Sequence, residues 1–177
     1  MNVVTPLFDA VYVDLKAFLV SVTGLDPSLV IQGLPNRSAM PPAAPGFVMM
    51  ELTRSARLRT NLDEWDTTNP APTDVTSEQG TELRMQLDLY GAASADWAVM
   101  LSTLLRDEIG CVALTPTCQP LYTDDPILAP LDDSEEQYEQ RWVITAVLQY
   151  NPVTSTPMQF ADTLTIDLIN VDEAYPP

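Results

Sequence analysis

The chain has 177 residues, and its 25 acidic against 8 basic side chains give it a net charge of −17. This length suits a single domain, spanning residues 1–177, that buries roughly 70% of its unfolded-chain surface. Phosphate binding needs clustered cations, so the charge argues against binding to free DNA or anionic membranes. Histidine is absent, which removes the usual general base, the usual triad partner and the commonest zinc ligand.

The cysteines and the N-terminus favour a cytosolic, reducing compartment. Cys111 and Cys118 have six residues between them, which matches neither a CxxC redox motif nor a zinc knuckle, so we expect two reduced thiols. The first twenty residues carry Asp9 and Asp14 and lack a basic n-region, so we expect no signal peptide. Polar and proline residues interrupt the charge-free stretch 142–161, so we expect no transmembrane segment.

The first element predicted is a helix over residues 6–22. Thr5 is the expected N-cap, Pro6 the first helical residue and Gly24 the left-handed residue after the end. An apolar stripe at helical spacing predicts the buried face: Phe8, Val11, Leu15, Phe18 and Val22. The apolar run 29–31 predicts a short strand.

The segments that follow alternate between connectors and strands. Residues 34–46 contain four prolines and predict an extended connector, and the apolar run 47–52 predicts a strand in the interior of a sheet. Residues 67–80 contain no aromatic side chain and predict a long mobile loop that becomes ordered on a partner.

Three arginines, Arg54, Arg57 and Arg59, lie within six residues of this acidic chain. Two interpretations are open: an exposed strand neutralised by nearby acids, or a contact between subunits or proteins. Guanidinium groups suit carboxylate recognition, and a second acidic copy of the chain supplies carboxylates. The acidic side chains considered for the same interface are Asp132, Asp133, Glu135 and Glu136.

The stretch 81–110 is the predicted folding unit. Residues 81–90 alternate strictly between apolar and polar side chains, as a half-buried antiparallel strand does. A helix is predicted from Ser94, as N-cap, to Gly110, and its apolar stripe can pack across the apolar face of the strand.

Carboxylates are dense in residues 131–139. They could bind a divalent cation or act as a paired acid and base, or they could form a solvated edge. No calcium-loop pattern is present, and nothing in the sequence places two of these carboxylates in a pocket shielded from water.

Two strands are predicted in the last part of the chain. Residues 140–150 are the most β-prone segment and predict a central strand. Residues 163–171 predict a final strand that forms a hairpin with it. The complete pattern predicts an α+β fold, an antiparallel or mixed sheet packed by two main helices.

Short sequence pieces in the second half resemble a family of bacteriophage neck proteins, the tail terminators. The pieces are QLDLYG (86–91), ADWA (95–98), LRDE (105–108), PLY (120–122), DDP (124–126), EQYEQRW (136–142), LQYNPV (148–153) and AYPP (174–177). The resemblance implies an α+β sandwich, with no catalytic residue, cofactor or metal.

The same resemblance implies a structural role in the virion neck of a long-tailed phage. Tail terminators form hexameric rings that cap the tail tube and meet the stopper, or head-completion, ring. The implied partners are further copies of the chain, the tail tube protein, the stopper and, in tails that have one, the sheath. Genomic DNA passes through the acidic lumen without specific binding. The implied location is the virion, and the host cytoplasm during assembly.

Two other functions remain open at this stage. Another head-tail joining component, a stopper or tail-completion protein, would share the same physical properties. A hydrolase that uses carboxylates of residues 124–139 with a divalent metal is the remote alternative.

Overall fold

This computed structural model describes residues 3–33, 41–42, 44–65, 74–129, 131–132 and 138–157. The elements along the chain are β1 (Val3–Thr5), α1 (Phe8–Thr23), a 3-10 turn (Pro27–Leu29), β2 (Val30–Gln32), β3 (Phe47–Arg57), β4 (Leu62–Trp65), β5 (Asp74–Glu78), β6 (Thr81–Tyr90), α2 (Ser94–Leu104), α3 (Glu108–Leu114), β7 (Gln119–Thr123), β8 (Ile127–Leu128), β9 (Leu131–Asp132), β10 (Tyr138–Glu139), β11 (Arg141–Tyr150) and β12 (Val153–Pro157). The predicted α+β class is confirmed.

A six-stranded sheet forms the body of the molecule. Its order is β2-β3-β6-β11-β7, with β8 also paired to β11. Only the β2–β3 pairing is parallel among these strands. The alternating segment 81–90 is β6, at the centre of the sheet, and the predicted strands at 47–52 and 140–150 are its two neighbours. Those three predictions are confirmed, and β3 continues five residues further than expected.

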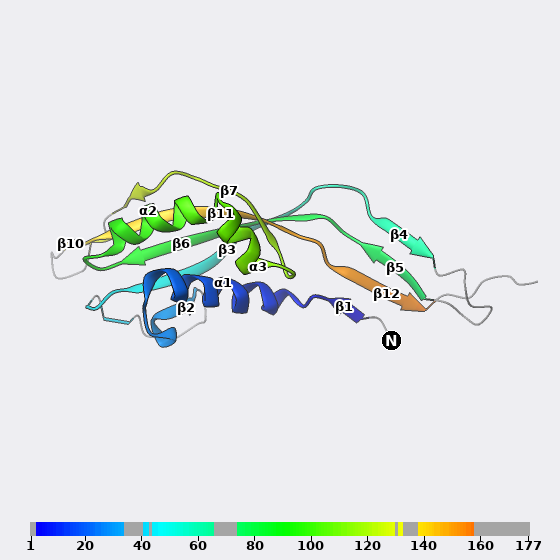
Figure 1. Ribbon diagram of the computed structural model, residues 1–177, viewed down its shortest axis with the longest axis horizontal. Helices are drawn as coiled ribbons and strands as arrows, with labels where there is room; N and C mark the ends of the chain where they lie inside the picture. Colours follow the sequence, from blue (N-terminus) through cyan, green and yellow to red (C-terminus); the bar gives the residue numbers. More distant parts are fainter. Residues whose placement is uncertain are drawn as a thin grey trace, which may run out of the picture.

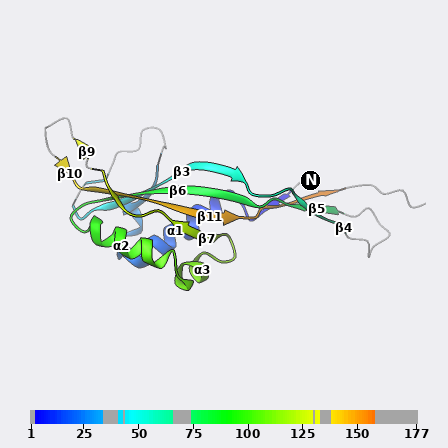
Figure 2. The same cartoon turned by 90° about the horizontal axis from the view of Figure 1, so that it is seen from above.

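The described helices pack on one face of this sheet, as Figure 2 shows. The core between them joins the apolar side of β6 to α1 and α2, and it contains Leu15, Leu19, Leu83, Met85, Leu87, Leu89, Leu101 and Ile144. Strand residues at alternate positions point into this core, so the others point to the opposite side of the sheet. We call that opposite side the open face.

The first helix begins later than predicted. Residues Val3–Thr5 pair with β12 as a strand, so Thr5 is not the N-cap and α1 starts at Phe8. Its end agrees with the prediction, because Gly24 has a φ of 69° and its N–H donates to the carbonyl of Val20 at 2.9 Å. A left-handed residue at this position favours glycine.

The helix predicted over 94–110 is two helices. The Asp107 side chain accepts a hydrogen bond from the Glu108 amide at 2.6 Å, which caps a new helix after the turn that ends α2. Ala93 rather than Ser94 is the N-cap of α2, and Gly110 lies inside α3 rather than at a helix end. The turn brings the backbones of the two helices so close that a Cβ on Gly110 would lie 2.7 Å from the carbonyl oxygen of Leu104.

A second, four-stranded sheet extends away from the body (Figure 1). Its order is β1-β12-β5-β4, and every pairing in it is antiparallel. We call this sheet the arm. In Figures 1 and 2 the described helices lie over the body, and the arm projects beyond them as a single layer.

The arm corrects part of one prediction. Residues 74–78 belong to the predicted loop 67–80, but they form β5, which pairs with β4 on one side and β12 on the other. The β-branched residues Val75 and Thr76 suit a strand, although the segment carries little apolar character of its own. Residues 67–73 of that prediction lie outside the described residues.

Two further predictions concern segments described only in part or not at all. Residues 41–42 and 44–46 of the predicted connector contain no helix or strand, and its remaining positions lie outside the described part. The strand predicted over 163–171, and its hairpin with β11, also lie outside it. The strand that follows β11 in the structure is β12, which the sequence did not predict.

Replacement of Gly110 by alanine tests the contact between α2 and α3. Alanine normally stabilises a helix interior by about 1 kcal/mol relative to glycine. Here the added Cβ meets backbone, so we expect Gly110→Ala to lower the free energy of unfolding by roughly 1–3 kcal/mol, measured by urea denaturation. Val112→Ala, at an exposed position of the same helix, is the control and should change it by less than about 0.5 kcal/mol. An increase in stability for Gly110→Ala would contradict the close packing.

Candidate interaction surfaces

The open face combines charged and apolar side chains. Pairing across β3, β6 and β11 aligns its residues in rows, because directly opposed residues point the same way. The rows are Met49, Asp88 and Val143; Glu51, Gln86 and Thr145; Arg54, Arg84 and Val147; and Ala56, Glu82 and Gln149. Strand β7 extends the third row with Tyr122. Three of the eight cationic side chains of the chain therefore lie on this face. Two are Arg54 and Arg84, and the third is Arg141, which lies opposite Tyr90 at the edge of the face.

A bulge in β3 determines which residues reach the open face. The register shifts between Leu52, which is opposite Met85, and Arg54, which is opposite Arg84. The extra residue is Thr53, whose hydroxyl donates to the carbonyl oxygen of Arg84 at 3.0 Å. A bulge changes the side to which the following side chains point. Without it, Arg54 would point to the helical side of the sheet.

The three predicted interface arginines do not share one surface. Arg54 is exposed on the open face, and within the described residues its side chain has no hydrogen bond or ion pair. Arg57 lies opposite Thr81 on the other face and donates to the Asn61 side chain at 3.0 Å. Arg59 follows the end of β3 and pairs with Glu78 in the arm.

Arg84 is the residue that the structure adds to this group. Its Nε donates to Glu82 at 3.0 Å, and one of its terminal nitrogens lies 3.5 Å from the Tyr122 hydroxyl. The hydrogen bond to Glu82 raises the pKa of the Arg84 guanidinium above its ordinary value. In the sequence, Arg84 is one of the polar residues of the alternating segment 81–90, and its neighbours across the sheet are too distant in sequence to be recognised there.

The open face also contains one buried ion pair. The Asp88 side chain is 1% exposed, and its carboxylate accepts from Arg141 at 3.0 Å and from the Gln86 amide at 3.0 and 3.2 Å. The Arg141 guanidinium lies 5.8 Å from the centre of the Tyr90 ring, which stacks on Phe47. This cluster fixes the end of the sheet near the β6–α2 turn.

The acidic residues proposed for the interface are only partly placed. Asp132 belongs to β9, whose backbone pairs with β10, while Asp133, Glu135 and Glu136 lie outside the described residues. Among the residues that the structure describes, no three histidine, cysteine or carboxylate side chains lie close enough to hold a metal ion. Of the described carboxylates in residues 124–139, Asp125 pairs with Arg106 at 2.9 Å.

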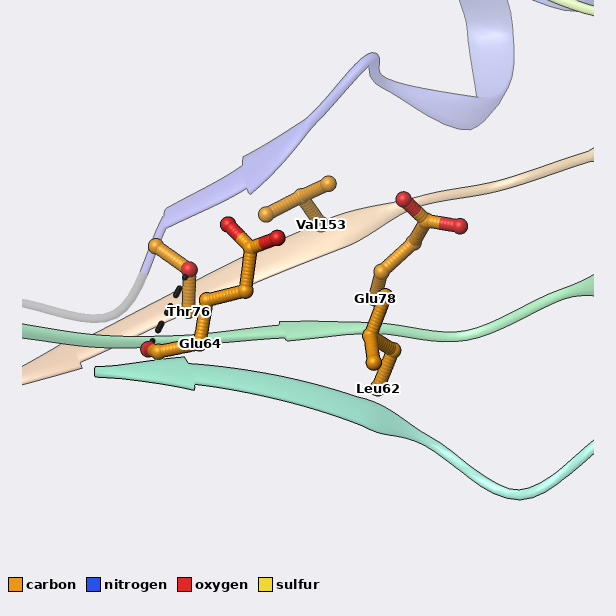
Figure 3. A pocket seen from close by; sticks show the side chains of 5 residues that line it. All are labelled: Leu62, Glu64, Thr76, Glu78 and Val153. Atoms are coloured by element: carbon orange, nitrogen blue, oxygen red, sulfur yellow. Dashed lines mark hydrogen bonds between the residues drawn. The ribbon is translucent and has the colours of Figure 1, made fainter.

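The arm has a shallow hollow of about 60 Å³ on one side. Leu62, Glu64, Thr76, Glu78 and Val153 line it, and Figure 3 shows the carboxylates of Glu64 and Glu78 standing on the same side of the strands. Glu78 pairs with Arg59, whereas the side chain of Glu64 has no ion-pair partner in the described part of the chain.

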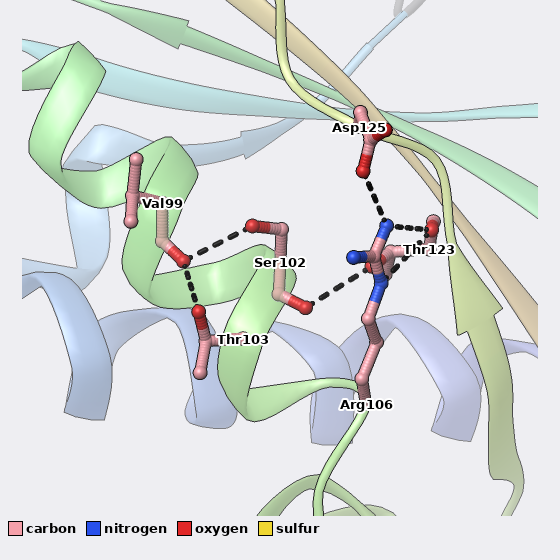
Figure 4. A network of polar contacts seen from close by, with 6 residues as sticks. All are labelled: Val99, Ser102, Thr103, Arg106, Thr123 and Asp125. Carbon is pink, nitrogen blue, oxygen red and sulfur yellow. Dashed lines mark hydrogen bonds and ion pairs between the residues drawn. The ribbon is translucent and has the colours of Figure 1, made fainter.

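A polar network attaches the end of α2 to β7 (Figure 4). Arg106 donates to the carbonyl oxygen of Thr123 at 2.6 and 3.2 Å and to Asp125 at 2.9 Å. The Thr123 hydroxyl in turn donates to the carbonyl oxygen of Ser102 at 3.2 Å. These contacts satisfy backbone groups, so we assign them a structural role.

Both cysteines are free, as predicted. Cys118 is buried beside Asp14, and burial raises the pKa of its thiol to about 12. The thiol is therefore protonated at neutral pH and is a poor nucleophile. None of the helices in the described regions has the length and apolar character needed to cross a bilayer.

The Asp88–Arg141 pair can be tested against an exposed pair. Arg141→Met leaves a buried carboxylate without its cation, so we expect a loss of about 3 kcal/mol in the free energy of unfolding. The double variant Asp88→Leu/Arg141→Met removes both charges and should recover most of that loss. Arg59→Met removes an exposed ion pair and should change stability by less than about 1 kcal/mol, as measured by urea denaturation. Equal effects of Arg141→Met and Arg59→Met would contradict the burial of Asp88.

Comparison with known proteins assigns the chain to a family. Residues 9–174 of the 177 match the family model described as phage neck terminator protein. Among curated proteins, none matches the chain significantly. The match covers both helical and strand regions of the body as well as the arm strands β4, β5 and β12. The chain therefore belongs to the phage neck terminator protein family, a family of structural proteins of the virion neck.

Proposed function

We propose that the protein forms a homo-oligomeric ring, a hexamer as the tail-terminator resemblance implies, that ends the tail tube and joins it to the stopper ring. The observation that carries this proposal is the family match over residues 9–174. The protein acts in this role through shape and association and performs no bond chemistry. Its proposed partners are further copies of itself, the tail tube protein, the stopper and the sheath where one is present.

The form of the subunit supports ring formation. A closed ring with one kind of subunit contact needs two different surfaces on each copy, one facing each neighbour. The arm and the open face are two such surfaces, since the arm projects from one end of the body (Figure 1). Several apolar side chains are exposed on the arm, on the open face and on the helices, as expected of association sites. They are Trp65, Val99, Ile109, Val112, Tyr122 and Ile127.

The charge of the chain supports the proposed passage of DNA. Each copy carries a net charge of −17, so a ring concentrates negative charge around its lumen. An acidic wall repels phosphate groups, which allows DNA to move through the ring without binding to it. Assembly of the ring takes place in the host cytoplasm before it becomes part of the virion.

Purified protein tests the ring proposal directly. We expect size-exclusion chromatography with light scattering to give a mass several times the 19.5 kDa of one chain, and negative-stain images to show rings. Labelled protein should bind at the end of purified tail tubes. A strict monomer that does not bind tails would contradict the proposal, and a label found only on the portal side would assign the chain to the stopper instead.

A further inference from the structure

Two guanidinium groups lie side by side on the open face because of the bulge in β3. Arg54 and Arg84 occupy directly opposed positions of neighbouring antiparallel strands. Like charges at opposed positions destabilise a sheet. Among the described residues, Arg84 has an acidic neighbour within hydrogen-bonding distance, Glu82, and Arg54 has none. The bulge therefore places a second cation where the fold alone would gain from its absence.

The surroundings of the two arginines suit a flat, mixed contact. Val147, beside Arg84 in the same row, is fully buried, although it points away from the helices. Arg84 and Tyr122 lie on either side of it in the same row, with a terminal nitrogen of Arg84 3.5 Å from the Tyr122 hydroxyl. Tyr122 is 42% exposed, and Ile127, which lies opposite Val143 further along the open face, is 62% exposed.

We propose that Arg54 and Arg84, together with Tyr122 in the same row, form a carboxylate-binding surface that receives the arm of a second copy of this chain. The inference rests on the proposed ring and names the surfaces that join its subunits. Arginine suits this role because its planar group pairs with carboxylates while its stem packs on apolar side chains.

Charge complementarity identifies the arm as the occupant. Glu64 and Glu78 stand on the same side of the arm, Glu78 between Leu62 and Val153 and Glu64 beside Thr76 (Figure 3). Among the described residues, Glu64 has no ion-pair partner. Leu62, on the same side of this edge strand as Glu64, is 47% exposed. The arm thus offers a carboxylate beside an exposed apolar side chain, which matches guanidinium groups with Tyr122 beside them.

The single-layer construction of the arm supports the same pairing. A sheet normally buries one of its faces against another layer. In Figures 1 and 2 none of the described helices covers the arm, so within the described part of the chain it lacks a helical second layer, which a neighbouring copy can provide. The arm points away from the body of its own chain, which leaves the body of a neighbouring copy within its reach.

A charge exchange tests this surface. We expect Arg54→Glu to raise the dissociation constant between subunits roughly tenfold or more, and Glu64→Arg to do the same, since each places like charges in contact. The combination Arg54→Glu/Glu64→Arg should restore assembly, because the pair is re-formed with its charges reversed. Light scattering across a concentration series measures assembly, and circular dichroism with urea unfolding verifies that each variant is folded.

Arg57→Glu is the matched control, since Arg57 lies in the same strand but on the opposite face. It should leave assembly within about twofold of the wild type. If Arg54→Glu assembled as tightly as the wild type, or if Arg57→Glu weakened assembly as much as Arg54→Glu does, this surface would be overturned while the ring proposal would remain. Failure of the exchanged pair to restore assembly would overturn the arm as the occupant. A wild-type protein that is always monomeric would instead reject the ring, and this surface with it.

Discussion

The structure depends on the pairing of β6 with β3 on one side and β11 on the other. Side chains alternate between the two faces of these strands, so a slip of one residue would exchange the core for the open face. The apolar residues of β6 hold the register, because each packs against the helices with an exposed fraction near zero. The bulge at Thr53 is a local exception that leaves this register intact on the β11 side while it moves Arg54 to the open face. Core stability and surface chemistry are therefore set by the same strand pairing.

The two sheets have different physical roles in this account. The body has a helical layer and a packed core, so it can be stable as a single subunit. Strands β5 and β12 of the arm carry mostly Ser, Thr and carboxylate side chains, so these two strands have little apolar area to bury by themselves. A subunit with one self-sufficient part and one part that needs a cover is suited to a closed assembly, where every arm finds a neighbouring body. This property fits a structural neck protein, whose function is to hold a defined position between other rings.

The sequence predicted the elements whose periodicity is local. Strict alternation identified β6 and β11, and an i, i+3, i+4 stripe with Gly24 identified α1 and its end. Prediction from the sequence failed where contacts between distant segments decide the structure. Residues 3–5 and 74–78 become strands because β12 pairs with both, and no local pattern encodes those partners. The break between α2 and α3 depends on a single capping carboxylate, Asp107, inside a segment that keeps helical character on both sides. The arginine cluster was noticed in the sequence, but the bulge that separates Arg54 from its neighbours was not visible there.

The most direct test of the account is an electron cryo-microscopy reconstruction of the assembled neck at a resolution that shows side chains. The account predicts that the arm of each subunit lies across the open face of the next, with Glu64 of one copy at Arg54 and Arg84 of the other. A reconstruction in which the open face is solvated, or in which neighbouring subunits meet only through their helices, would contradict it.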